Sequence, residues 1–295
     1  MPASVDPATR CRPSVAEALI YRMPVVFGPA LGPRQDPDGV RYSNSEAPNK
    51  CHYSVRIRMP RESLADLCPP RTDLPEDPVV TVRCSYLENL PWLGGRGYNI
   101  LSVSWPIIYA TSSGRRVHGS FVPVLWENLA DSVIIGREEL GYPKLFAEIP
   151  PPAPAGDSVA LSARWFGHVF ATLSVSPVAG IDLAATSDPS ISAEDRSASD
   201  NVFVYKYIPR TGAWGLADCE YMTFSSGSTS RERVVESVSM RGSVEFRRST
   251  WQELPTMCHI VNALAALPWG DVVGGARVRT VGSTDYREQH PADDE

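Results

Sequence analysis

The sequence predicts a mainly β protein of the α+β class, with one large antiparallel, barrel-like sheet and a few short helices. Its 295 residues suit one large β domain, a type that commonly reaches ~200–250 residues, or two smaller domains. Segments rich in β-branched and aromatic residues recur along the chain, whereas a single stretch is long enough for a sustained helix. The 27 prolines are scattered, which excludes collagen-like and long-helix architectures. Because strands flank the polar segment 184–200 on both sides, one domain is favoured over two.

The strand candidates share short length, frequent alternation and bounding turn residues. They are 52–58, 79–86, 98–110, 115–126, 131–135, 157–164, 166–175, 201–208, 217–225, 233–239, 243–248 and 271–281. The one long helical candidate is 250–266. The glycine-rich stretch 94–97 lacks the Gly-Lys-Ser/Thr ending of a phosphate-binding loop, so it is interpreted as a tight connection between strands.

The remaining segments are short helices and loops. A short helix is expected at 14–22 and another at 60–67, where a proline stands near the first position. The segment 28–49 is rich in Pro, Gly, Asn and Ser and is expected to wrap the surface as a loop. The segment 184–200 is expected to be a solvent loop or a disordered insert, and 283–295 a polar tail.

Composition and charge exclude several classes of function. The net charge of −6 comes without a basic block, which argues against nucleic-acid binding because phosphates require clustered Lys and Arg. No apolar run approaches the ~18 residues of a membrane span, and the N-terminus lacks a signal pattern, so we expect a soluble cytoplasmic protein without membrane partners. The six cysteines form no C-x-x-C pair and the five histidines show no metal-ligand spacing. We therefore expect reduced cysteines, no metal and no cofactor.

Lysine is unusually rare in this chain. Of the 28 basic residues only Lys50, Lys144 and Lys206 are lysines. Arginine cannot lose its proton in a protein, whereas a desolvated lysine amine can and then acts as a nucleophile. Codon bias would produce the same scarcity, so the pattern points to the lysines without assigning them a role.

The segment 132–149 carries the most informative lysine. It begins as an apolar, strand-like run, breaks at Gly136, and places Lys144 between Pro143 and the pair Leu145-Phe146. A free lysine amine titrates near pH 10.4, which leaves about one in two thousand neutral at pH 7, and apolar surroundings increase that fraction. Two interpretations follow: a nucleophilic Lys144, or a structural Lys144 that pairs with Glu138 or reaches solvent.

The pattern G-R-E-x-x-x-Y-P-K in this segment resembles the signature of the acetoacetate decarboxylase superfamily, whose lysine forms a Schiff base with substrate. Further segments, 121–138, 202–223 and the ending near 245–281, resemble parts of the same family, so that the resemblance covers about residues 40–281. It implies an antiparallel, cone-like β-barrel around a largely apolar cavity. The expected organisation is an N-terminal extension and loop at 1–39, the barrel at 40–282 and the polar tail at 283–295.

The family's functional positions are only partly retained. The resemblance places Lys144 on the Schiff-base lysine and keeps Arg137, Glu138, Tyr142 and Pro143. A second lysine follows immediately in the decarboxylase, whereas this chain has leucine at position 145. The family's two pocket carboxylates fall on a serine and an isoleucine, at 85 and 100, and its pocket arginine falls near the lysine at position 50. Acetoacetate is therefore expected to be a poor substrate.

These observations predict a Schiff-base lyase that acts on a keto acid or a polyketide-like carbonyl compound. An iminium withdraws electrons during decarboxylation and also acidifies the neighbouring carbon, which supports aldol, dehydration and cyclisation chemistry. The expected catalytic residues are Lys144, Glu138 and Tyr142, and the expected substrate-binding residues are Lys50, Ser85, Tyr98, Ile100 and Arg137. The expected partners are a small-molecule carbonyl substrate and further copies of the chain in a homo-oligomer. The alternative is a binding protein that keeps the barrel and cavity without the chemistry.

Overall fold

The computed structural model describes residues 19–42, 45–178 and 200–294, and its central strands follow directly from alternating apolar side chains. In β4 (Arg96–Ala110) every second residue from Leu101 to Tyr109 is buried, and β1 (Asn49–Arg58) repeats the pattern at Tyr53, Val55 and Ile57. Successive side chains of a strand point to opposite faces, so each strand presents one apolar face to the main core.

Fourteen strands form one mixed sheet, in the order β14-β11-β10-β5-β4-β3-β1-β13-β12-β9-β8-β7, with β2 paired to β4 and β6 paired to β5. The strands not yet bounded are β2 (Thr72–Asp73), β3 (Val79–Leu90), β5 (Arg116–Glu127), β6 (Lys144–Phe146), β7 (Ala153–Ala155), β8 (Ser158–Trp165), β9 (His168–Pro177), β10 (Val202–Pro209), β11 (Ala217–Ser225), β12 (Arg233–Phe246), β13 (Val272–Val281) and β14 (His290–Pro291).

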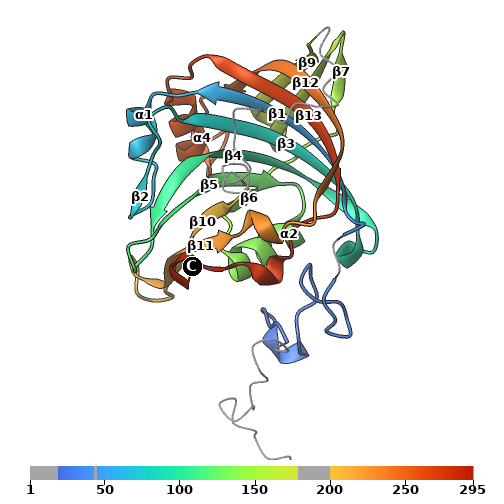
Figure 1. Cartoon of the computed structure of the whole chain (residues 1–295), viewed down its shortest axis with the longest axis vertical. Coiled ribbons are helices and arrows are strands. Elements are labelled where there is room, and N and C mark those ends of the chain that lie inside the picture. Colours follow the sequence, from blue (N-terminus) through green and yellow to red (C-terminus); the bar gives the residue numbers. More distant parts are fainter. Residues whose placement is uncertain (1–18, 43–44, 179–199, 295) are drawn as a thin grey trace, which may run out of the picture.

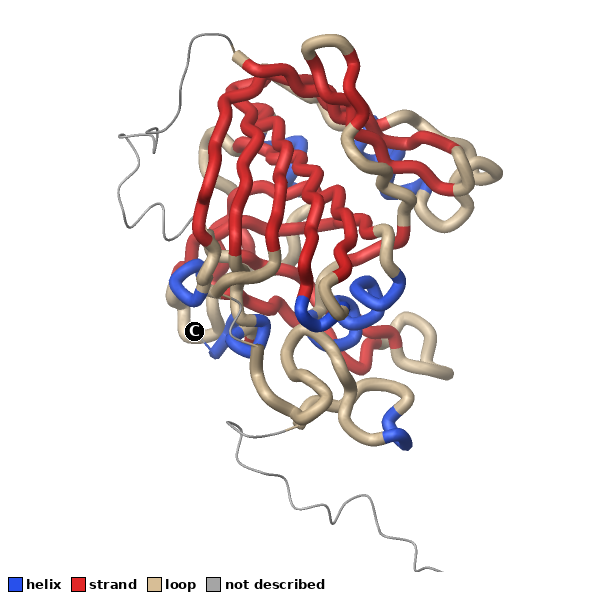
Figure 2. The backbone as a smooth tube through the Cα atoms, turned by 90° about the vertical axis from the view of Figure 1, so that its right-hand side faces the viewer, coloured by secondary structure: helices blue, strands red, loops and turns tan. Residues whose placement is uncertain are grey.

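The sheet curves strongly but does not close, as Figures 1 and 2 show. Most neighbouring strands are antiparallel, and two short pairs, β5 with β6 and β5 with β10, are parallel. Strand β12 is long enough to pair with β13 through its first part and with β9 through its second, so it carries the sheet around the curve. The predicted fold class, a cone-like barrel of mainly antiparallel strands with few helices, is confirmed.

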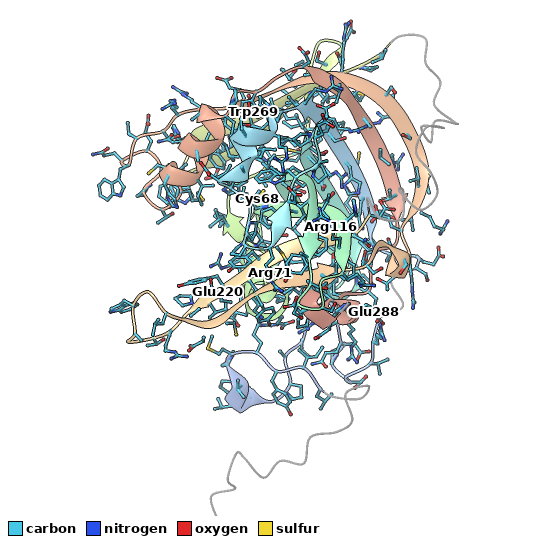
Figure 3. All side chains as sticks on the ribbon, turned by 60° about the vertical axis from the view of Figure 1, so that its left-hand side comes forward. Cys68, Arg71, Arg116, Glu220, Trp269 and Glu288 are labelled. Carbon is cyan, nitrogen blue, oxygen red and sulfur yellow. The ribbon has the colours of Figure 1, made fainter. Side chains whose placement is uncertain are left out.

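The helices are short and lie at the ends of the strands. They are α1 (Arg61–Ala65), α2 (Ala130–Ile135), the π-helical turn η4 (Gly136–Leu140) and α4 (Cys258–Ala266), with 3-10 turns at Val25–Phe27, Pro91–Leu93, Gly227–Thr229, Tyr286–Glu288 and Ala292–Asp294. None of the helices in the described part of the chain is long and apolar enough to cross a membrane. Figure 3 shows α4 standing against the curved sheet near Trp269.

Four local expectations differ from the structure or lie outside it. The strand expected at 131–135 is helix α2, because Ser132 and Ile135 are buried by tertiary contacts that override the β preference of the Val-Ile-Ile run. The helix expected at 250–266 starts only at Cys258, after turns around Pro255, which has no N–H for a helical hydrogen bond. Residues 19–22 of the helix expected at 14–22 are not helical. Residues 14–18 and nearly all of the polar segment 184–200 lie outside the described residues.

The functional face of the sheet is the one opposite the main core. Trp126 is fully buried in the main core, so its neighbours Leu125 and Glu127 point to the other face. There a smaller apolar cluster forms around Leu87, Leu90 and Tyr98, beside a cavity that the structure places at the ends of β3, β4 and β5.

Candidate active site

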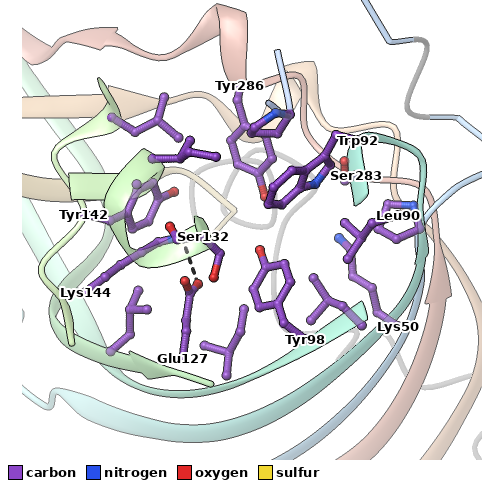
Figure 4. A pocket seen from close by; sticks show the side chains of 18 of the residues that line it. Lys50, Leu90, Trp92, Tyr98, Glu127, Ser132, Tyr142, Lys144, Ser283 and Tyr286 are labelled. Carbon is purple, nitrogen blue, oxygen red and sulfur yellow. Dashed lines mark hydrogen bonds and ion pairs between the residues drawn. The ribbon is translucent and has the colours of Figure 1, made fainter. Parts of the chain in front are cut away.

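A cavity of about 120 Å³ lies where strand ends, α2, η4 and the C-terminal residues meet. Figure 4 shows its walls. The apolar part of the lining consists of Pro33, Pro48, Leu87, Leu90, Pro91, Trp92, Ile100, Leu125, Ile135, Gly136 and Leu140. The polar part consists of Lys50, Tyr98, Glu127, Ser132, Tyr142, Lys144, Ser283 and Tyr286. A small, mostly apolar space with a few converging polar groups is typical of a small-molecule site.

Lys144 points into this cavity from the start of β6, which pairs in parallel with the end of β5. Its amine lies 2.8 Å from Oε1 of Glu127 and donates a hydrogen bond of 3.2 Å to the carbonyl oxygen of Ser132. The ring of Tyr142 lies under the same amine, 5.5 Å from its nitrogen. Only 11% of the Lys144 side chain is exposed. These three contacts fix the position of its amine in the cavity wall.

The amine occupies space that only a glycine at position 136 leaves free. A β-carbon on Gly136 would lie 2.3 Å from Cε of Lys144 and 2.7 Å from its amine, well inside van der Waals contact. Gly141 ends η4 with a φ of 84°, a left-handed conformation that favours glycine, and turns the chain toward Tyr142 and Lys144. The two glycines of the motif therefore shape the lysine's position through sterics and backbone conformation.

Two further contacts hold the π-helical turn η4 in place. The buried amine of Lys206, on β10, donates to the carbonyl oxygens of Glu138 and Glu139 at 2.9 and 3.2 Å. Burial lowers the pKa of this amine. On the other side, the carboxylate of Glu139 binds both Arg22 and Arg34 of the N-terminal segment. All three lysines of the chain thus lie in or directly behind one site.

Glu127 is the acidic group that sequence reasoning missed. It is 1% exposed, its Oε1 faces Lys144, and its Oε2 has no hydrogen-bond partner among the described residues. The sequence contained one signal for it: in an alternating strand, Leu125 and Glu127 share the face opposite Trp126. The predicted strand 115–126 ended one residue too early to use that signal.

Three tyrosines complete the polar lining. Burial raises the pKa of Tyr142 to about 12 and holds those of Tyr98 and Tyr286 well above the usual value, with smaller contributions from nearby acidic groups. All three phenols therefore stay protonated at neutral pH and can donate hydrogen bonds. Tyr286 belongs to the C-terminal segment, which was expected to be a polar tail and which gave no sequence signal for a site residue.

Lys50 lies across the cavity from Lys144 (Figure 4). Its amine binds the carboxylate of Glu232, which also lies 3.4 Å from Nε2 of His52. The other ring nitrogen of His52, Nδ1, is 2.7 Å from Oγ of Ser85. Four side chains thus contact one another in series, starting at the cavity wall with Lys50 and continuing through Glu232 and His52 to Ser85.

The structure brings together five of the eight residues proposed from the sequence: Lys144, Tyr142, Tyr98, Ile100 and Lys50 line the cavity. The other three lie outside its wall. Arg137 donates a hydrogen bond of 3.0 Å to the backbone oxygen of Lys144, Glu138 contributes its backbone oxygen to Lys206, and Ser85 contacts His52. The expected apolar neighbours Leu145 and Phe146 do not line the cavity either, and Phe146 is 45% exposed. Within the described ranges, no group of three or more His, Cys, Asp or Glu side chains could hold a metal ion.

Gly136→Ala is expected to displace the amine of Lys144 while leaving the fold intact. The backbone at Gly136 is right-handed helical, so alanine fits the helix, and the atoms that must move belong to the far end of the lysine side chain. We expect at least about a tenfold loss in the rate at which a carbonyl compound and cyanoborohydride label Lys144. Gly274→Ala is the matched control, since a β-carbon there meets nothing within 4 Å. Equal labelling of the two variants would contradict the steric role of Gly136.

Comparison with known proteins gives one family and several related structures. The family model described as acetoacetate decarboxylase matches residues 22–285. No curated protein sequence matches the chain. A solved acetoacetate decarboxylase is 14% identical with a TM-score of 0.61, over 83% of this chain and 89% of that one. The acetoacetate decarboxylase of Legionella pneumophila subsp. pneumophila str. Philadelphia 1 is 17% identical with a TM-score of 0.57, over 83% and 90%.

A third similar structure comes from a different enzyme. The enduracididine biosynthesis enzyme MppR, solved in complex with pyruvate, is 14% identical with a TM-score of 0.58, over 90% of this chain and all of that one. At such identities the likeness shows a shared fold. The fold is therefore common to decarboxylases and to an enzyme of a biosynthetic route.

Proposed function

Because the chain belongs to the acetoacetate decarboxylase family, we propose that it is a Schiff-base enzyme in which Lys144 forms an iminium with a carbonyl compound and Glu127 transfers the protons. The observation that carries this proposal is the 2.8 Å contact between the amine of Lys144 and a carboxylate that is 1% exposed, on the wall of a small cavity. Nucleophile and base within hydrogen-bond reach are the arrangement that amine catalysis requires.

The steps follow from the positions of these two groups. Glu127 accepts one proton from the ammonium of Lys144, and the freed nitrogen attacks the carbonyl carbon. The nitrogen then gives up a second proton, which passes to the former carbonyl oxygen. The resulting carbinolamine loses its hydroxyl group as water, with a proton returned by Glu127, and leaves the iminium. The hydrogen bond from Lys144 to the Ser132 carbonyl orients the nitrogen during this sequence.

A base beside the iminium favours proton-transfer chemistry over simple loss of CO2. Loss of CO2 from an iminium needs only an electron sink, and the enamine carbon takes up a proton afterwards, whereas aldol, retro-aldol and dehydration steps begin when a base removes a proton. Oε2 of Glu127 is buried without a hydrogen-bond partner in the described part of the chain and is free for this role, and the three protonated phenols are available to bind substrate oxygens. MppR has been solved in complex with the condensation product of pyruvate and imidazole 4-carboxaldehyde, so condensation is compatible with this fold. We propose an aldolase- or dehydratase-type lyase.

Reductive trapping tests the proposal. The protein is incubated with neutral aldehydes and ketones and with keto acids, in the presence of cyanoborohydride, then cleaved after arginine. Each lysine falls in a separate peptide, Lys50 in 42–56, Lys144 in 138–164 and Lys206 in 197–210, so mass mapping assigns the adduct directly. We expect the adduct on 138–164. If no carbonyl compound labels that peptide, the chain is better described as a binding protein that keeps the family fold.

A further inference from the structure

The cavity contains two cations, and each is matched by one carboxylate. Among the described residues, the charged groups of the lining are Lys50, Lys144 and Glu127. Lys144 is paired with Glu127, and Lys50 is paired with Glu232, which lies just outside the wall. The exposed fractions of the Lys50 and Glu232 side chains are 10% and 28%, so this second pair is also largely shielded from water.

Glu232 is held in its position by several groups. The amine of Lys50 and Nε2 of His52 face its carboxylate, and its backbone N–H donates to Oγ of Ser230. Burial alone would raise the pKa of Glu232, but the adjacent His52 ring and the hydrogen-bonded amine of Lys50 hold it well below its usual range. The carboxylate is therefore ionised at neutral pH, and Lys50 has its counter-charge before any substrate enters.

Among the residues that the structure describes, this cavity offers a substrate carboxylate no comparable unpaired cation. To bind Lys50 it must compete with Glu232, and elsewhere it faces the negative charge of Glu127 or apolar walls such as Leu87 and Leu90. Removing an unpaired carboxylate from water is costly, whereas a neutral carbonyl compound needs only hydrogen bonds, which the protonated phenols can supply.

We infer that Glu232 sets the substrate class: by neutralising Lys50 it makes the site selective for a neutral aldehyde or ketone over a keto acid. This inference rests on the Schiff-base function proposed above and specifies its substrate. Glu232 acts as a specificity-determining residue that reaches the substrate only through Lys50.

A matched pair of probes tests it: methyl levulinate, which is neutral, and levulinate, which is its carboxylate. Both carry the same methyl ketone, and neither can lose CO2 through an iminium because the carboxyl group is one carbon too far away. The concentration that half-saturates cyanoborohydride labelling of peptide 138–164 is measured for each. The wild-type protein is expected to prefer the ester by at least about tenfold. Charges a few ångströms apart in a protein interact strongly enough to produce a difference of this size.

Glu232→Gln keeps the shape of the side chain and removes its charge, which leaves Lys50 available to a substrate carboxylate. We expect the ratio to shift toward levulinate by roughly tenfold or more. The matched control is Glu236→Gln, which lies on β12 four residues after Glu232 and is paired with Arg277 and Arg279. Its ratio should stay at the wild-type value. Should Glu232→Gln not fold, Lys50→Met provides the opposite test, because it removes the cation, keeps the negative charge of Glu232 and should strengthen the preference for the ester.

The outcomes separate this inference from the proposed function. If neither probe nor any other carbonyl compound labels peptide 138–164, the Schiff-base function is wrong. If both probes label it equally in the wild-type protein, or if Glu232→Gln leaves the ratio unchanged, the Schiff base stands and the role of Glu232 is overturned.

Discussion

Lys144→Arg is expected to abolish covalent labelling and catalysis while the protein stays folded. Arginine keeps the positive charge beside Glu127 but cannot lose its proton, so it cannot attack a carbonyl carbon. The measurement is deuterium exchange at the carbons next to the ketone of methyl levulinate in D2O, followed by proton NMR. An iminium acidifies these carbons, so the wild-type protein should exchange them faster than buffer and the Arg variant at the buffer rate.

A second variant distinguishes chemistry from charge. Lys144→Met removes both the nucleophile and the charge, so an enzyme loses exchange in both variants. A binding protein that uses Lys144 only as a cation would retain ligand in the Arg variant and lose it in the Met variant. Circular dichroism and thermal melts on the same preparations establish that both variants fold. A folded Arg variant that exchanges at the wild-type rate would exclude the Schiff-base mechanism.

The sequence could predict the sheet and the lysine because both are local signals. Alternation within β4 and β1 can be read over about ten residues, and the motif around Lys144 spans the short distance from Gly136 to the lysine itself. The rarity of lysine pointed to the same group of residues: Lys50 lines the cavity, and Lys206 supports the turn before Lys144. That common location was not visible from the composition.

The parts of the site that the sequence did not predict depend on contacts between distant segments. Tyr286 lies in a polar stretch without periodicity and reaches the cavity only because the C-terminal residues return beside β11, with which β14 pairs. Helix α2 contains a Val-Ile-Ile run, which by itself favours a strand. Burial of Ile135 in the cavity wall stabilises the helix instead. The family's two acidic positions fall on Ser85 and Ile100, as the sequence indicated, and the carboxylate that the sequence did not indicate comes from the next strand, where Ile100 pairs with Glu127 across β4 and β5.

That shift of the carboxylate by one strand also changes the chemistry we expect. In the register of the sheet, Ser85, Ile100 and Glu127 are consecutive cross-strand neighbours. A carboxylate at the third of these positions contacts the amine directly, and it replaces Glu138 as the proposed proton carrier because Glu138 does not line the cavity. The proposed proton transfer by Glu127 can therefore be tested separately from the nucleophilic attack by Lys144.

Glu127→Gln is expected to lower deuterium exchange by about 10²–10⁴-fold, the usual cost of losing a general acid or base. The amide keeps the size of the side chain and can still accept a hydrogen bond from Lys144, but it cannot take up a proton. The nucleophilic amine of Lys144 is still present in this variant, so its reductive labelling should persist at long incubation times. A steep loss of exchange together with surviving labelling is the signature of a base, which a purely structural role would not produce.

Two companion variants make the Glu127 result decisive. Glu148→Gln is the matched control, because Glu148 forms its ion pair with Arg164 at the surface, and it should leave exchange unchanged. Breaking a buried ion pair by removing one partner costs about 3–5 kcal/mol, so the Gln variant could be too unstable to assay. Glu127→Asp then serves in its place: it keeps the charge, withdraws the carboxylate by one methylene, and should give an exchange rate between those of buffer and the wild-type protein. Wild-type exchange in a folded Gln variant would show that another group moves the proton, and Tyr142, whose ring already lies against the amine, would be the next residue to replace.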